Sequence, residues 1–316
     1  MADQAVDPRP LLLSSIEISG SRVEFSDSPI VLLCGGPVLL KDRVEDDDPP
    51  LASLRDAITR SIPPYEIFRP EEIQGWHNDA IYKNLMDFEA DLASICSLVV
   101  VVLESAGALV ELGAFSQFPE LSKKLIAVKS SSYSDDPSFI NLGVLRYMMD
   151  NHPSCVKNYP WSVNRPQEIS RDVVDDVISD VADELSKLGK GQRLKPSLAT
   201  HIIVLICEIV RLMTALKEGE ILEYLAIFGV DLPKEKLRSK LFLLEEFRLL
   251  VRVVYSDSTF YLRGSESYHR LSFAFKSDSR LDAFRVEMDV KAYYSADPKS
   301  RHRLRAIAQA TERARK

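Results

Sequence analysis

The first half of the chain alternates short, nearly continuous apolar runs with longer amphipathic stretches. The clearest runs are Ile30–Cys34 and Leu98–Leu103, and each is bounded by turn or polar residues. Strands of a parallel sheet show this uninterrupted hydrophobicity because helices cover both of their faces. Further strands are predicted at Tyr65–Phe68 and Lys124–Val128, and helices at residues 51–62, 79–95, 109–118 and 170–188.

This alternation of strands and helices predicts an α/β fold with a doubly wound, mostly parallel sheet over residues 28–190. Residues 1–27 are polar and irregular and are expected to form an N-terminal extension, with a candidate edge strand at Arg22–Phe25. The glycines of residues 189–191 predict a linker after the last helix of this domain.

The second half is mainly helical and ends in a hairpin pattern. Three helices followed by a two-stranded hairpin is the element order of a winged helix, which we predict over residues 195–297. Residues 298–316 are expected to form a basic helical tail. The predicted helices are 201–216, 221–228 and 233–247, and the predicted strands are Leu250–Tyr255 and Thr259–Arg263.

Composition narrows the class of protein. Hydrophobic residues make up 46% and charged residues 28% of the chain, as in ordinary globular proteins. No run reaches the roughly 18 uncharged apolar residues of a membrane span, so we expect no membrane segment and a cytoplasmic location. The four cysteines lie far apart without a Cys/His cluster, so neither a disulfide framework nor a metal site is predicted.

The charge differs between the two halves. Residues 1–194 hold 18 basic and 31 acidic residues, a net charge of −13, whereas residues 195–316 hold 22 and 16, a net charge of +6. This step favours two domains with different partners, although a modest basic excess is also typical of an ordinary solvated surface.

Polar and glycine residues follow the predicted strands of the first half. Gly35 and Gly36 follow the first strand, Arg69 the second, and the segment Glu104–Glu111 the central one. Because ligands bind beyond the carboxyl ends of parallel strands, these segments are expected to line one pocket. The two glycines offer backbone N–H groups to a phosphate, or they form a plain turn.

Glu111 is the strongest candidate for chemistry. We place it in the first turn of a helix that follows the central strand, where the helix dipole favours the ionised carboxylate. A carboxylate held in a cleft can attack an anomeric carbon and form a covalent glycosyl-enzyme. The alternative is an ordinary glutamate at a helix start.

Weaker candidates surround it. Asn141 can hydrogen-bond a ribose or form an Asx turn, and Glu89 either faces the pocket or is a solvated helix charge. Arg69 can meet a phosphate or pair with Glu71 or Glu72. No Ser-His-Asp pattern and no metal-ligand set is present in the sequence. The residues expected to bind substrate are Gly35, Gly36, Arg69, Glu89, Glu104, Gly107 and Asn141.

A basic pattern opens the third helix of the second half. Lys236 and Lys240 are four residues apart and share a helix face, and Lys234 and Arg238 form a second row. This is the position of a recognition helix, so these four residues are candidates for contacts with nucleic-acid phosphates. Winged helices also dock on proteins, and that alternative stays open.

Four segments in register carry a resemblance to a known family. They are Leu33–Gly36, Phe88-Glu89, Glu111–Ser116 and Ser138–Gly143. Together they resemble the effectors of bacterial retron antiphage systems that combine a nucleoside-deoxyribosyltransferase-like domain with a C-terminal winged helix. The resemblance covers approximately residues 28–150 by motif and the rest by architecture.

The resemblance implies a function. In deoxyribosyltransferases the nucleophile is the glutamate that matches Glu111, and it cleaves the N-glycosidic bond of a nucleotide. NAD is the substrate expected for the retron effectors, with no further cofactor. The implied partners are the retron reverse transcriptase and its RNA-linked single-stranded DNA, and an oligomer is left open.

The sequence departs from the transferase pattern just before the nucleophile. Transferases carry an acidic residue there, whereas this chain has Gly107 and Ala108, and Glu104 is the nearest acidic residue. Hydrolysis is therefore expected rather than transfer to an acceptor. Our hypothesis is a toxic N-glycosidase effector, and the alternative is a non-catalytic, nucleotide-sensing and nucleic-acid-binding regulator.

Overall fold

The computed structural model describes residues 6–25, 29–39, 49–73, 81–133, 137–189, 191–266, 268–276 and 282–314. These residues fall into two compact units. The α/β unit comprises the described residues of 28–75 and 84–188, and the C-terminal unit comprises those of 1–27, 76–83 and 189–316. The first described residues therefore belong to the same unit as the last described ones.

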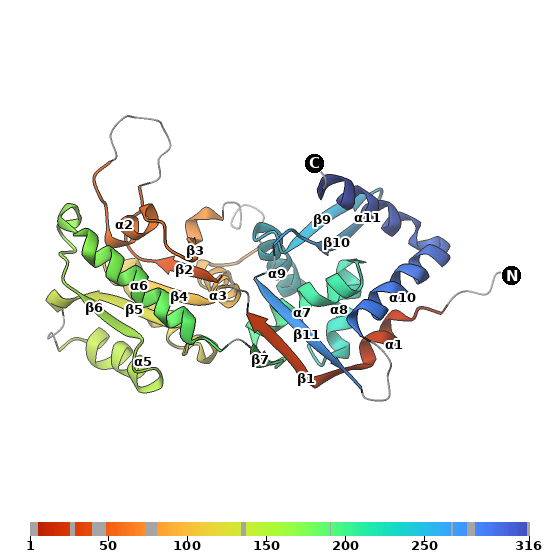
Figure 1. Ribbon diagram of the computed structural model, residues 1–316, viewed down its shortest axis with the longest axis horizontal. Coiled ribbons are helices and arrows are strands. Elements are labelled where there is room, and N and C mark those ends of the chain that lie inside the picture. Colours follow the sequence, from red (N-terminus) through yellow and green to blue (C-terminus); the bar gives the residue numbers. More distant parts are fainter. Residues whose placement is uncertain are drawn as a thin grey trace. The chain divides into compact units, whose positions relative to one another are not determined.

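The α/β unit is built on a five-stranded sheet in which every pairing is parallel (Figure 1). This confirms the predicted parallel sheet. The spatial order is β3-β2-β4-β5-β6, which is a common order of doubly wound sheets. All residues of β2, β4 and β5 are buried, as their apolar runs predicted. The strands are β2 (Ile30–Cys34), β3 (Glu66–Phe68), β4 (Leu98–Val102), β5 (Leu125–Ser130) and β6 (Val156–Tyr159).

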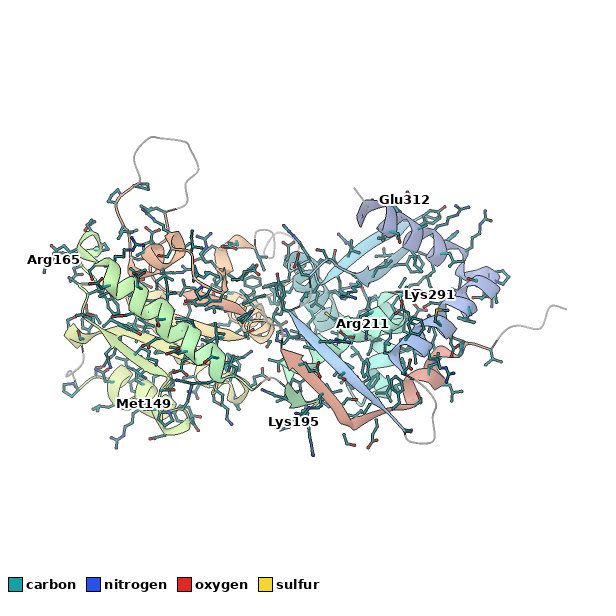
Figure 2. All side chains as sticks on the ribbon, viewed as in Figure 1. Met149, Arg165, Lys195, Arg211, Lys291 and Glu312 are labelled. Carbon is teal, nitrogen blue, oxygen red and sulfur yellow. The ribbon has the colours of Figure 1, made fainter. Side chains whose placement is uncertain are left out.

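The helices of this unit begin at short polar caps. The side chains of Ser53, Asn84, Ser105 and Ser170 each accept a backbone N–H from the first turn of a helix. Helices α2 and α6 pack against each other, and charged side chains such as Arg165 lie at the surface (Figure 2). The helices are α2 (Leu54–Arg60), α3 (Leu85–Ile95), α4 (Ala106–Phe115), α5 (Arg146–Asn151) and α6 (Arg171–Lys187).

The C-terminal unit has the predicted order of three helices followed by a hairpin. A short strand that the sequence did not predict, β8, lies between the first two helices and pairs with the hairpin in the order β8-β10-β9. No helix among the described residues is long and apolar enough to cross a membrane. The elements are α7 (Ala199–Leu212), β8 (Ala215–Leu216), α8 (Glu218–Ile227), α9 (Lys234–Glu246), β9 (Leu250–Tyr255) and β10 (Ser258–Arg263).

The N-terminal residues form part of this unit. Helix α1 (Arg9–Ser14) leads into β1 (Ile16–Phe25), which pairs antiparallel with both β7 (Gly191–Arg193) and β11 (His269–Phe275). The prediction of an irregular extension with an edge strand is therefore wrong, because β1 is the central strand of a three-stranded sheet. Polar residues suffice here because only one face is covered: Val23 is 1% exposed and its neighbours are not buried.

A buried ionic cluster joins both ends of the chain to α8. The guanidinium of Arg9 donates to Glu220 at 2.7 Å, and that of Arg303 donates to the same carboxylate at 2.6 and 2.9 Å. Both guanidinium groups lie over the ring of Tyr294. The paired arginines keep the pKa of Glu220 below its ordinary value although burial, the largest influence, raises it.

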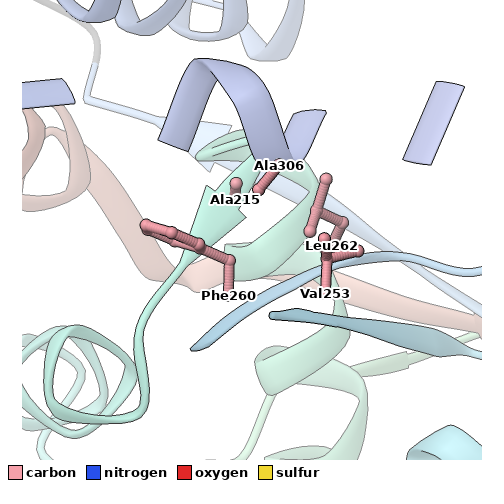
Figure 3. Packing of buried hydrophobic residues seen from close by; sticks show 5 residues of the cluster. All are labelled: Ala215, Val253, Phe260, Leu262 and Ala306. Carbon is pink, nitrogen blue, oxygen red and sulfur yellow. The ribbon is translucent and has the colours of Figure 1, made fainter. Parts of the chain in front are cut away.

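The C-terminal helices are also part of the packed unit. They are α10 (Ala283–Ala296) and α11 (Arg301–Ala314). Ala306 of α11 is fully buried, and it packs with the hairpin in a core of Ala215, Val253, Phe260 and Leu262 (Figure 3). The basic tail is helical as predicted, but it is not simply a solvated helix, because Arg303 and Ala306 are buried.

Candidate active site around Glu111

Glu111 lies in the second turn of α4. The helix begins at Ala106, because the side chain of Ser105 accepts the backbone N–H of Ala108 at 3.1 Å. The prediction that Glu111 occupies the first turn is therefore wrong, and the helix dipole, which acts within the first turn, contributes little to its ionisation. What replaces the dipole is a set of charges and donors from other elements.

The carboxylate of Glu111 lines a cavity of about 370 Å³. Among the described residues of the lining, Glu89 on α3 is the only other ionisable one, and apolar side chains make up most of the rest. The Oε2 atom of Glu111 is buried and has no hydrogen-bond partner among the residues that the structure describes. The lining residues are Leu85, Met86, Glu89, Ala106, Gly107, Val110, Glu111, Ala114, Phe115 and Phe118.

The two carboxyl groups have different environments. Burial, and after it the negative charge of Glu111, raises the pKa of Glu89 to about 7. Burial also raises the pKa of Glu111, but the Arg55 guanidinium and a hydrogen bond from the Cys34 thiol oppose that rise. Glu111 is thus the carboxylate that ionises more readily, and Glu89 is the one that keeps a proton near neutral pH.

Arg55 is a member of this site that the sequence analysis missed. It lies on α2, is 3% exposed, and donates to the carbonyl oxygens of Leu33 at 2.9 Å and Gly36 at 3.3 Å. Its other donors reach Glu71 at 2.8 and 2.6 Å. These contacts hold the guanidinium at the carboxyl end of β2, where its positive charge favours the ionised form of Glu111.

The loop of Gly35 and Gly36 is shaped by close packing. A Cβ added at Gly36 would lie 2.8 Å from Cβ of Ser53 and 3.0 Å from Cδ of Glu104, and one at Gly35 would lie 3.1 Å from Cβ of Val102. Only glycine permits these approaches without movement of a neighbour. The glycine pair therefore lets α2 and Glu104 come close to the end of β2.

The carboxylate of Glu104 accepts hydrogen bonds from backbone N–H groups. Its two oxygens accept the N–H groups of Gly36 at 3.0 Å, Leu54 at 2.7 Å and Arg55 at 3.0 Å. The carboxylate thus holds the start of α2 against the loop after β2. The N–H of Gly36, which was a candidate phosphate donor, is used in this contact.

A second cavity also borders the start of α4. It has a volume of about 410 Å³, and Ala106 lines both this cavity and the cavity of Glu111. Asn141 is in its lining, as is Lys129 of β5, which the sequence analysis did not select. The remaining lining residues are Leu103, Glu104, Ser105, Leu109, Tyr133, Ser138, Ile140, Leu145 and Val163.

The structure separates the predicted substrate-binding residues into groups. Glu89 and Gly107 line the Glu111 cavity, whereas Glu104 and Asn141 line the second one. Arg69 lines neither of these cavities and donates to Glu72 at 2.6 Å, which is one of the ion pairs considered from the sequence. No group of side chains among the described residues is suited to hold a metal ion.

The basic residues of α9 differ in exposure. Lys240 is only 5% exposed, so the prediction that it reaches phosphates together with Lys236 is wrong. Lys234 and Arg238 are exposed, but both pair with Glu218 of α8, at 3.4 and 2.9 Å. The positive charge of this helix is therefore partly compensated within the unit.

Residues 81–83 cover one side of α9. The hydroxyl of Tyr82 donates to the carbonyl oxygen of Ser239 at 3.1 Å, and the Ser239 hydroxyl donates to the carbonyl oxygen of Ile81 at 2.8 Å. Tyr82 is 5% exposed. The face of α9 that carries Ser239 and Lys240 is thus an interior face of the C-terminal unit, which explains why Lys240 is buried.

Comparison with known proteins bears on both units. In Escherichia coli, the "Retron Ec73 putative ribosyltransferase/DNA-binding protein" is 28% identical over 166 residues, which cover 48% of this chain and 52% of the relative. The "Retron Ec86 putative ribosyltransferase/DNA-binding protein" of the same species is 33% identical over 90 residues, which cover 26% of this chain and 27% of the relative. The chain thus spans about half the length of the first relative and about a quarter of the second.

A family model gives the broader match. The model described as "STM3845 retron effector protein" matches residues 51–252, which extend from just before α2 of the α/β unit into β9 of the C-terminal unit. The matched segment is more than half of the chain. The chain therefore belongs to the family of STM3845 retron effector proteins.

Proposed function

We propose that this chain is the toxic effector of a retron antiphage system and that it cleaves the N-glycosidic bond of a nucleotide, with NAD as the expected substrate. The observation that carries the proposal is the Glu111 cavity. Half-buried Glu111 has one buried oxygen without a partner among the described residues, and a second carboxyl group that holds a proton near neutral pH lines the same cavity. Glycosidases use two such groups as nucleophile and proton donor.

In the proposed reaction a carboxylate oxygen of Glu111 attacks the anomeric carbon of the ribose. The new C–O bond forms while the C–N bond to the base breaks, and the bonding electron pair leaves with the base nitrogen. Nicotinamide leaves NAD as a neutral molecule because its ring nitrogen is cationic before cleavage. A purine base instead takes a proton from Glu89.

The covalent intermediate is then hydrolysed. Water attacks the anomeric carbon of the glycosyl ester, ionised Glu89 accepts the proton of that water, and the carboxylate of Glu111 leaves. With a purine nucleotide Glu89 therefore acts as acid in the first step and as base in the second, as in retaining glycosidases, whereas with NAD it acts only as the base. The apolar walls, including Phe115 and Phe118, provide surface for a flat base.

The relatives support the same class of chemistry and a second function. Their names pair ribosyltransferase with DNA-binding, and the C-terminal unit here has the helix and hairpin order of a winged helix. We assign the α/β unit to a doubly wound, deoxyribosyltransferase-like fold. The C-terminal unit is proposed to dock on the retron reverse transcriptase and its RNA-linked single-stranded DNA, with Lys234, Lys236 and Arg238 facing phosphates.

The test of the enzymatic function is base release by the purified full-length chain. Wild-type protein is incubated with NAD and with common nucleotides, and free base is separated and measured. Glu111→Gln is expected to lower the rate by at least about 10³-fold, because an amide cannot act as the nucleophile. Expression of this variant is expected to relieve toxicity to the host cell.

Two controls make the result decisive. Glu168→Gln removes an exposed carboxylate of the same unit, outside both cavities, and is expected to leave the rate unchanged. Circular dichroism checks that Glu111→Gln is folded. Retained turnover in a folded Glu111→Gln protein would refute the assignment, and absence of any base release by wild type would favour a nucleotide-sensing regulator.

A further inference from the structure

The second cavity holds a buried positive charge. Lys129 is the second-last residue of β5, at the carboxyl end of a central strand, and it is 8% exposed. Its Nζ donates to Oδ1 of Asn141 at 2.9 Å. Within the part of the chain that the structure describes, this amide oxygen is the recorded partner of the ammonium, and no carboxylate pairs with it. A buried charge with a neutral partner alone is unfavourable for the fold.

Asn141 orients this lysine without neutralising it. The Nδ2 atom of Asn141 donates to the carbonyl oxygen of Tyr133 at 3.0 Å, which fixes the direction of its Oδ1 atom toward Lys129. An ammonium group has three donors, of which Asn141 takes one. No acceptor among the described residues is recorded for the remaining donors, which can therefore serve a molecule in the cavity.

The start of α4 adds to the positive potential. Ser105 and Ala106, the cap and the first residue of this ten-residue helix, line the same cavity. The amino end of a helix favours anions. The Glu104 carboxylate also borders the cavity, but its two oxygens are engaged by three backbone N–H groups.

We propose that Lys129 binds a phosphate group of the substrate, so that the enzyme selects nucleotides over unphosphorylated nucleosides. This inference rests on the proposed function, because Ala106 lines both cavities and thereby places the phosphate site next to the site of glycosidic cleavage. A substrate then spans the first turn of α4, with its base and anomeric carbon at Glu111 and its phosphate at Lys129. The cavity volume of about 410 Å³ accommodates such a group.

The test compares two substrates that share the same scissile bond. NAD and nicotinamide riboside both release nicotinamide, but nicotinamide riboside lacks phosphate. Lys129→Met is expected to lower kcat/KM for NAD by about 10- to 100-fold, the usual effect of one charge-assisted hydrogen bond. The value for nicotinamide riboside is expected to change by less than about twofold, and Lys129→Arg is expected to restore most of the preference for NAD.

Further measurements separate the phosphate site from the fold and from the nucleophile. Lys123→Met removes an exposed lysine just before β5 and should leave both rates unchanged. If Lys129→Met does not fold, competitive inhibition of wild-type NAD cleavage by inorganic pyrophosphate, together with the Lys129→Arg kinetics, decides the question. Equal losses with both substrates, or no loss with either, would overturn the inference.

A binding measurement that involves no turnover tests the phosphate site independently. ADP-ribose retains the phosphates of NAD but lacks the scissile bond, so its affinity, measured by calorimetry, does not depend on Glu111 chemistry. If wild type releases no base yet binds ADP-ribose, and Lys129→Met weakens that binding by at least tenfold, the phosphate site is supported and the proposed function is refuted. Absence of ADP-ribose binding by wild type would refute the phosphate site itself.

Discussion

Replacement of Glu89 by glutamine tests the environment of the two carboxyl groups through protein stability. The pKa of Glu89 is raised from an ordinary 4.5 to about 7, first by burial and then by the charge of Glu111. Above pH 4.5 the unfolded chain ionises this group while the folded chain still holds the proton. The free energy of unfolding therefore falls as pH rises toward about 7 and levels off above it.

The size of the effect follows from the pKa change. A rise from 4.5 to about 7 corresponds to a total loss of about 3 kcal/mol of stability, of which about 2 kcal/mol is lost between about pH 5.5 and pH 8. Glu89→Gln has the same shape and no charge at any pH. The free energy of unfolding of this variant, compared with that of wild type at the same pH, is therefore expected to increase by about 2 kcal/mol from about pH 5.5 to pH 8.

The assay is urea unfolding followed by tryptophan fluorescence. The chain has two tryptophans, and Trp161 is 6% exposed in the α/β unit, so a Trp76→Phe background leaves one reporter of this unit. Glu168→Gln in the same background is the control and should show no such pH dependence. A difference between Glu89→Gln and wild type that stays constant from about pH 5.5 to pH 8 would refute the buried, protonated carboxyl.

Two further predictions concern α9 and the glycine loop. Lys236→Glu is expected to weaken DNA binding mainly at low salt and to reduce the salt slope by about 1, which fluorescence anisotropy at several salt concentrations measures; an equal effect at all concentrations would indicate protein docking instead. Gly36→Ala is expected to destabilise the α/β unit by about 1–3 kcal/mol, because the new Cβ would press on Ser53 and Glu104, and unchanged urea unfolding would contradict this.

The strands that the sequence predicted best are those whose own residues carry the signal. β2, β4 and β5 are apolar along their whole length, and their observed bounds lie within a few residues of the predicted runs. β6 was missed because its residues Val156–Tyr159 are mostly polar and half-exposed, and its pairing with β5 determines its conformation. β1 was misjudged for the same reason, since its partners come from the far end of the sequence.

The positive charges of the site were harder to predict than its carboxylates. Arg55 and Lys129 occur in unremarkable sequence, one in an amphipathic helix and one at the end of an apolar strand. Their importance depends on burial and on neighbours more than ten residues away, such as Glu71 and Asn141. A hydrophobic pattern indicates which face of a helix or strand is buried, but it does not indicate which polar side chain, distant in the sequence, will contact a charged residue there.

Glu89 and Glu111 show what the fold adds to a correctly chosen pair of residues. Both residues were chosen from the sequence, and the helix dipole was expected to favour the ionised form of Glu111. Because α4 begins at Ala106, Glu111 lies in the second turn, where the dipole has little effect. In the folded chain burial raises the pKa of both groups. At Glu111 the Arg55 guanidinium and the Cys34 thiol oppose this rise, whereas at Glu89 the negative charge of Glu111 adds to it and Arg55 is the weakest influence. Because two adjacent carboxylates resist simultaneous ionisation, the charge on one stabilises the proton on the other. The proposed nucleophile and proton donor are therefore one coupled pair, and a substitution at either position is expected to change the protonation of the carboxyl group that is left.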